Sequence, residues 1–106
     1  MARFVTALLD LDGTLSDPRQ GITRCIQHAL RELDRSTPHE DELLWCIGPP
    51  LRRSFARLLE SDDPALLDRA LALYRARFST VGMYENVVYD GIPQALDRVR
   101  RAGVCL

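Results

Sequence analysis

The sequence predicts an α/β protein in which a parallel-sheet core is interrupted by an inserted block of helices. Three observations lead to this fold class. Residues 4–9 are almost continuously apolar, as in a strand buried on both faces. Helical periodicity dominates residues 17–82, and a second apolar segment begins at Val104. We therefore expect residues 1–16 and 83–106 to form the core, and residues 17–82 to form an inserted helical domain.

Two acidic residues follow the first predicted strand directly. Asp10 and Asp12 are separated by one residue, so strand periodicity places their carboxylates on the same side. Ligands of open α/β sheets bind outside the carboxyl ends of the strands, where this pair lies. Adjacent carboxylates repel each other unless a cation lies between them, and such oxygen donors suit Mg²⁺. Gly13 allows a sharp turn that exposes backbone amides to an anion. The alternative interpretation is a simple strand-ending turn.

The segment Asp10-Leu11-Asp12-Gly13-Thr14, after an apolar strand, resembles the first signature of the haloacid dehalogenase (HAD) superfamily of phosphotransferases. In that superfamily the first Asp is the nucleophile that takes the phosphoryl group, and the second is a general acid/base. The resemblance implies these roles for Asp10 and Asp12, which would also be the Mg²⁺ ligands. Leu11, Gly13 and Thr14 would then contact the substrate. Dehalogenating members lack an acid at the second position, so Asp12 indicates phosphoryl transfer.

The resemblance also implies a fold. It predicts a HAD-like Rossmannoid core with an inserted α-helical cap. This chain would contain only part of that core: the first strand, one core helix and the start of the second strand.

The composition argues against several other classes of protein. The chain has 106 residues, is 46% hydrophobic and carries a formal net charge of −1, which is typical of a small globular domain. It has no basic footprint for nucleic acid and no apolar run near the roughly 20 residues of a membrane span. The first residues lack the apolar core of a signal peptide, so we expect a cytoplasmic protein. Cys25, Cys46 and Cys105 lie far apart in apolar contexts and are expected to be buried thiols.

Two helices are expected in the first half of the inserted block. Ser16-Asp17-Pro18 has the residues of a helix start, and an apolar stripe follows as far as Leu33. A short second helix is predicted over residues 40–47, with Gly48 after its end. Its expected buried side chains are Leu43, Leu44 and Ile47.

A proline-stiffened loop, Gly48-Pro49-Pro50, is expected to lead into a third helix. Structurally it could be only a corner between helices. However, the string from Gly48 to Leu51 resembles the phosphoglycolate phosphatase-like branch of the superfamily, in which a cap loop at this place selects the substrate. The resemblance implies substrate contacts from Gly48, Arg52 and Arg53, because the arginine fork matches a carboxylate or a phosphate. Which arginine faces the substrate is left open.

The chain is then expected to return to the core. Asp63-Pro64 marks the start of a long fourth helix that ends near Val81. A short amphipathic helix follows Gly91, and a second strand begins at Val104. Two short parallel strands leave their faces uncovered, so we expect this chain to be part of a longer protein. The family's phosphate-binding Ser or Thr, its Lys or Arg and its acidic metal ligands would lie beyond it, and the chain contains no lysine.

These observations predict a Mg²⁺-dependent phosphatase that acts on a small phosphomonoester, resembling phosphoglycolate phosphatases, through an aspartyl-phosphate at Asp10. The 106-residue chain by itself is expected to lack part of the active site. A phosphosugar mutase of the same superfamily is an alternative, since it needs the same pair of acids. A non-catalytic binding module, in which the cap helices mediate association into a homodimer, is another.

Overall fold

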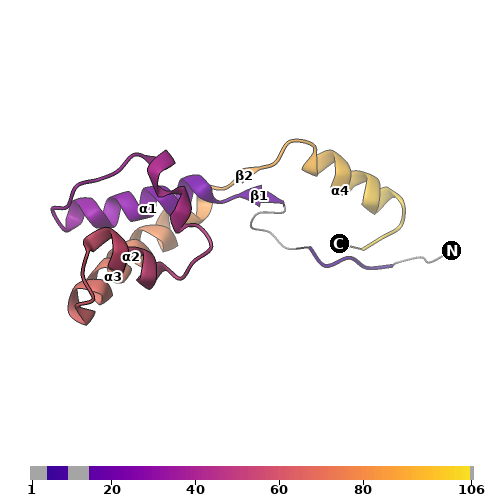
Figure 1. Ribbon diagram of the computed structural model, residues 1–106. Coiled ribbons are helices and arrows are strands. Elements are labelled where there is room, and N and C mark those ends of the chain that lie inside the picture. Colours follow the sequence, from indigo (N-terminus) through magenta and orange to yellow (C-terminus); the bar gives the residue numbers. More distant parts are fainter. Residues whose placement is uncertain (1–4, 10–14, 106) are drawn as a thin grey trace. The chain divides into compact units, whose positions relative to one another are not determined.

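The computed structural model describes residues 5–9 and 15–105 (Figure 1). The chain divides into two compact units, one formed by residues 1–18 with 87–106 and the other by Arg19–Asn86. We call them the terminal unit and the helical unit. The predicted division into core and cap at residues 17 and 82 remains a prediction about domains and their roles.

Three α-helices and two short 3₁₀ helices make up the helical unit. They are α1 (Arg19–Glu32), η1 (Glu40–Cys46), α2 (Leu51–Leu59), α3 (Pro64–Thr80) and η2 (Gly82–Tyr84). The start of α3 was predicted correctly: the carboxylate of Asp63 accepts a hydrogen bond from the amide of Ala65, and Pro64 occupies the first turn. Helix α2 ends at Leu59, and the next residue, Glu60, adopts the left-handed conformation with φ 50°.

The hydrophobic core of the described residues lies within the helical unit. Helix α3 packs against both α1 and α2. Phe55 of α2 meets Tyr74 of α3 edge to face, with ring centroids 6.3 Å apart, and Tyr74 stacks on Phe78 at 5.8 Å. The fully or almost fully buried apolar side chains are Cys25, Ile26, Ala29, Leu30, Leu43, Cys46, Phe55, Leu59, Leu67, Ala70, Leu71 and Tyr74.

The predicted helix over residues 40–47 is a 3₁₀ helix, and its buried side chains differ from those expected. Leu43 and Cys46 are buried, whereas Leu44 is 41% exposed and Ile47 is half-buried. A 3₁₀ helix has three residues per turn, so positions i and i+3 face the same side. That period aligns Leu43 with Cys46, whereas the α-helical period would have aligned Leu43 with Ile47.

In the terminal unit, the described residues form short strands and one helix. Strand β1 (Ser16–Asp17) pairs antiparallel with β2 (Val87–Val88), and α4 spans Ile92–Arg101. Ser16-Asp17-Pro18 was predicted to start a helix, but the helix begins only at Arg19. The reason is that residues 16 and 17 are extended by pairing with a distant segment, which a local capping pattern does not report.

The first predicted strand pairs in parallel with the last segment of the chain. Thr6 and Cys105 form a parallel bridge, in which the Ala7 amide donates to the Cys105 carbonyl at 2.9 Å. The Cys105 amide donates to the Val5 carbonyl at 2.7 Å. Burial on both faces of this strand was predicted and is wrong for the described residues, since Val5 is 76% and Leu8 95% exposed. One bridge on one edge covers neither face of a strand.

Other residues of the terminal unit are also exposed to solvent. Cys105 is exposed, in contrast to the prediction of a buried thiol, whereas Cys25 and Cys46 are buried as expected. Helix α4 is strongly amphipathic but has no fully buried residue. Among the described residues, none of the helices has the length and apolar content needed to cross a membrane.

Two glycines allow the ends of the helical unit to approach each other. A Cβ atom on Gly21 of α1 would collide with the carbonyl of Gly82. A Cβ atom on Gly82 would lie 2.5 Å from Cys25 Sγ and 3.1 Å from Phe78 Cδ2. The absence of side chains at these two positions therefore permits α1 and η2 to lie in direct contact.

Gly82→Ala should destabilise the helical unit by about 1–3 kcal/mol, because the methyl group must displace Cys25 or Phe78 in a packed region. Urea denaturation followed by the fluorescence of Trp45, the single tryptophan, measures this loss. Cys25→Ala removes the sulfur that the methyl group meets. The double variant should therefore be more stable than the sum of the two single losses predicts, by roughly 0.5 kcal/mol or more. Strict additivity would contradict this account of the packing.

Candidate functional site

The predicted catalytic segment, Asp10, Leu11, Asp12, Gly13 and Thr14, lies outside the residues that the structure describes. The residues on either side of it are described, and both sides belong to the terminal unit. Before it, residues 5–7 pair with Cys105 in parallel. After it, the Leu15 carbonyl accepts a hydrogen bond from the Tyr89 amide at 3.2 Å, and β1 follows. Ser16, at the start of β1, is buried, with 2% of its surface exposed.

The predicted metal ligands are the same two acids, so their coordination stays a prediction. Among residues 5–9 and 15–105, no three His, Cys, Asp or Glu side chains are grouped closely enough to hold a metal ion. The donor chemistry of Asp10 and Asp12 fits Mg²⁺, since paired carboxylates are the hard oxygen ligands that this ion prefers.

The predicted substrate loop lies on the surface of the helical unit. Gly48 is exposed and has φ 109°, a conformation that favours glycine. Pro50 precedes the first turn of α2, and the amides of Arg53 and Ser54 both donate to its carbonyl. Ser54 itself is 1% exposed and faces the core. The exposed polar side chains offered by this corner are therefore those of Arg52 and Arg53.

An open groove of about 450 Å³ lies beside the start of α2. The structure distinguishes the two arginines that sequence could not rank. Arg52 Nη1 lies 2.6 Å from Asp68 Oδ1 of α3, so this guanidinium already has a carboxylate partner. Arg53 makes no ion pair with any carboxylate in the described part of the chain. The groove is lined by Pro50, Arg52, Arg53, Ala56, Asp62 and Leu67.

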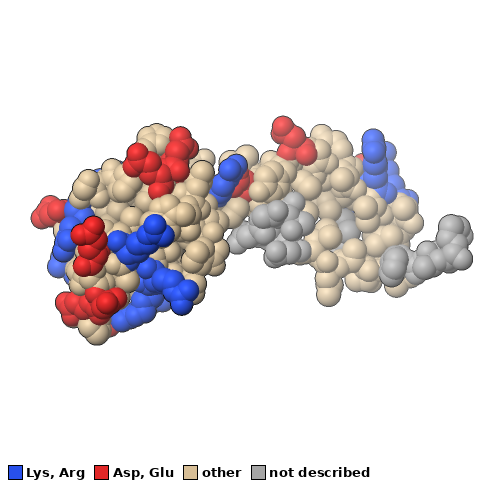
Figure 2. Space-filling model, in the orientation of Figure 1, with Lys and Arg blue, Asp and Glu red and all other residues tan. Residues whose placement is uncertain are grey.

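Acidic side chains at this groove were not predicted from the sequence. Asp62 lines it, and Asp68 holds one of its arginines. No local motif marks Asp68, which follows the buried Leu67 in α3. Only the packing of α2 on α3 brings it to Arg52. Figure 2 shows arginine and acidic side chains intermingled on one face of the helical unit.

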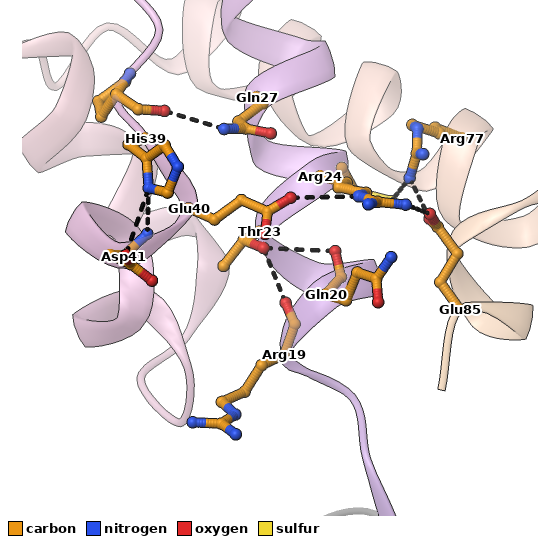
Figure 3. A network of polar contacts seen from close by, with 12 residues as sticks. Arg19, Gln20, Thr23, Arg24, Gln27, His39, Glu40, Asp41, Arg77 and Glu85 are labelled. Carbon is orange, nitrogen blue, oxygen red and sulfur yellow. Dashed lines mark hydrogen bonds and ion pairs between the residues drawn. The ribbon is translucent and has the colours of Figure 1, made fainter. Parts of the chain in front are cut away.

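A second polar cluster connects three helices of the helical unit with Glu85 (Figure 3). Glu85 accepts from two arginines: Arg77 Nη1 at 2.6 Å through Oε1, and Arg24 Nη1 at 2.8 Å through Oε2. Arg24 Nε also donates to Glu40 at 3.1 Å, and Arg77 Nη1 lies 3.3 Å from Cys25 Sγ. The cluster therefore links α1, η1 and α3 with Glu85, one residue before this unit ends.

The cluster shifts the proton affinities of its members in the directions expected for ion pairs. The hydrogen bond from Arg77, followed by that from Arg24, lowers the pKa of Glu85. The same contacts with Glu85 raise the pKa of Arg77 and of Arg24. Burial raises the pKa of the Cys25 thiol, and Arg77 opposes that rise only in part. Both oxygens of Glu85 are engaged, so we interpret this cluster as structural.

Comparison with known proteins identifies the family of this chain. A family model described as "Haloacid dehalogenase-like hydrolase" matches residues 7–106. The chain belongs to this family. A solved structure, a putative phosphatase from Clostridium difficile, superposes with a TM-score of 0.89 at 32% sequence identity, over 98% of this chain and 47% of that one. The fold is therefore a partial HAD-like fold, as the motif at Asp10 and Asp12 implied.

Curated relatives differ in their named activities. A 5'-nucleotidase from Pseudomonas aeruginosa is 45% identical over 95 residues, which is 90% of this chain and 42% of that protein. Tyrosine-protein kinase PtkA from Mycobacterium tuberculosis is 35% identical over 99 residues, 93% of this chain and 33% of that one. A phosphoglycolate phosphatase from Agrobacterium fabrum is 31% identical over 108 residues, which cover 94% of this chain and 45% of that protein. The chain thus spans less than half the length of each of these relatives.

Glu85→Gln should make the helical unit less stable at about pH 7 and less sensitive to acid. Because folding lowers the pKa of Glu85, its carboxylate stabilises the fold above its ordinary pKa, and this contribution is lost as pH falls through the folded value. Urea midpoints measured from Trp45 fluorescence between about pH 7 and pH 3 test this. Glu32→Gln, which changes an exposed glutamate of α1, is the matched control. Equal acid sensitivity of Glu85→Gln and the unchanged chain would contradict the assignment.

Proposed function

We propose that the protein to which this chain belongs is a Mg²⁺-dependent phosphatase that hydrolyses a small phosphomonoester through a phosphorylated Asp10. The observation that supports the proposal is the parallel pairing of residues 5–7 with Cys105. In the sequence, Asp10 and Asp12 follow this paired segment after residues 8 and 9. In a parallel sheet, the position beyond the carboxyl end of a strand is where ligands bind. Membership of the HAD-like hydrolase family supports the proposal.

The chemistry is divided between the two acids. A carboxylate oxygen of Asp10 attacks phosphorus, and the bond from phosphorus to the ester oxygen breaks. Asp12, in its acid form, gives its proton to the departing alkoxide, so an alcohol leaves. A water molecule then attacks the phosphorus of phospho-Asp10 while Asp12 takes its proton, which releases inorganic phosphate and restores both acids. Mg²⁺ held by Asp10 and Asp12 would neutralise charge on the phosphoryl oxygens.

The names of two relatives, a 5'-nucleotidase and a phosphoglycolate phosphatase, support a phosphomonoester as the substrate class. The two names refer to substrates that differ in the part attached to the phosphate. We propose that Gly48, Arg52 and Arg53 contact that remote end. The relative named as a tyrosine kinase belongs to a different reaction class, so the experiment must measure hydrolysis directly.

Asp10→Asn should abolish hydrolysis, because an amide cannot form the acyl phosphate, and Asp12→Asn should lower kcat by about 10²–10⁴-fold. Phosphate release from p-nitrophenyl phosphate, a nucleoside 5'-monophosphate and 2-phosphoglycolate measures both effects. The assay is run with and without Mg²⁺ on the 106-residue chain and on the complete gene product that carries it. Asp90→Asn, which changes an exposed acid outside the motif, is the control for a general loss of charge.

The outcomes separate the candidate functions. Hydrolysis by the complete gene product that vanishes in Asp10→Asn supports the phosphatase. Transfer of the phosphoryl group within a sugar phosphate, without release of phosphate, would instead favour a mutase. A complete gene product that is silent with all three substrates and self-associates would favour a binding module, and the exposed apolar residues Val5 and Leu8 would then be its first candidate surface.

A further inference from the structure

The groove beside α2 holds two arginines whose electrostatic situations differ. Arg52 lies 2.6 Å from Asp68, and Arg53 has no carboxylate partner among the described residues. Asp62 also lines the groove. With Asp68 counted as the partner of Arg52, the charges of the two guanidinium groups are balanced by those of two carboxylates.

We propose that Asp68 determines the charge selectivity of this groove. While Asp68 occupies Arg52, the groove offers one available guanidinium, that of Arg53, to an incoming anion. It then favours a singly charged carboxylate over a doubly charged phosphate. The assignment of this anion as the remote end of the substrate rests on the proposed function.

The geometry of ion pairing supports a preference for one charge. A planar guanidinium presents a pair of N–H donors that match the two oxygens of one carboxylate. Arg53 alone can form that pair without displacing any group in the described part of the chain. A doubly charged phosphate needs a second cation to balance it. The second cation here is Arg52, which it could recruit only by displacing Asp68, and it would also be repelled by Asp62.

The pair of Arg52 and Asp68 is suited to such a role because it is exposed. The side chain of Arg52 is 47% exposed and that of Asp68 is 69% exposed. Exposed ion pairs contribute little to folding stability, so Asp68 can be replaced without unfolding the helical unit. Replacing Asp68 should therefore change the affinity of the groove for a ligand more than it changes folding stability, because the replacement frees Arg52 for a second contact with that ligand.

Asp68→Asn should strengthen binding of inorganic phosphate, by up to about fivefold, and should change binding of acetate much less. The measurement is a titration of the ¹⁵N-labelled chain followed by amide and arginine side-chain NMR shifts. It is done at about pH 8, where inorganic phosphate is mostly doubly charged. Arg53→Gln should weaken the binding of both anions, and should weaken acetate binding more than Arg52→Gln does. In the double variant with Asp68→Asn, Arg52→Gln should cancel the gain in phosphate binding.

Arg69→Gln is the matched control, because it removes an exposed positive charge next to Asp68 but outside the groove. Equal gains for acetate and phosphate in Asp68→Asn would overturn the proposal, since they would indicate a general change in surface charge. Loss of acetate binding in Arg52→Gln but not in Arg53→Gln would also overturn it. The titration needs neither Mg²⁺ nor turnover, so its result stands apart from the hydrolysis assay. Absence of hydrolysis with intact anion selectivity would reject only the phosphatase.

Discussion

The packing of α1 against α3 is the contact on which the rest of the helical unit depends. Both helices carry fully buried alanines, Ala29 in α1 and Ala70 in α3, among the side chains of this close-packed core. Helix α2 is then held on α3 by Phe55 against Tyr74, and this contact sets where Arg52 and Arg53 emerge. The groove is therefore a product of the helical core, although none of its charged side chains is buried in that core.

Local sequence patterns were sufficient to predict the helices but not to predict which strands pair. The bounds of α3 follow from a capping acid, a proline and a continuous apolar stripe, all contained in one short stretch of sequence. The short helix predicted at residues 40–47 is a 3₁₀ helix, and its buried side chains were predicted wrongly because its apolar residues fit either helical period. The pairing of β1 with β2 joins segments far apart in the chain, and no local pattern at Ser16 or Val88 specifies it.

The candidate site also contains some residues that the sequence could identify and others that it could not. The pattern from Asp10 to Thr14 is local, so sequence alone identified it, and the family match supports that identification at the level of the family. The choice between Arg52 and Arg53 was not open to sequence reasoning, because the two are adjacent and chemically identical. The deciding group is Asp68, which belongs to another helix. Asp68 acts through its ion pair with Arg52, and no sequence pattern around Asp68 marks that pairing.

The cluster around Glu85 shows why the most strongly perturbed groups are not the best candidates for ligand binding. Perturbed pKa values often mark functional sites, but ion-pair networks that only hold a fold together produce them as well. Glu85 has both oxygens engaged by Arg24 and Arg77, so it has little capacity left for a further partner. Arg53 lies at an open groove and has no such carboxylate partner in the described residues. In this chain, spare hydrogen-bonding capacity at an accessible surface is the better guide to where an anion would bind.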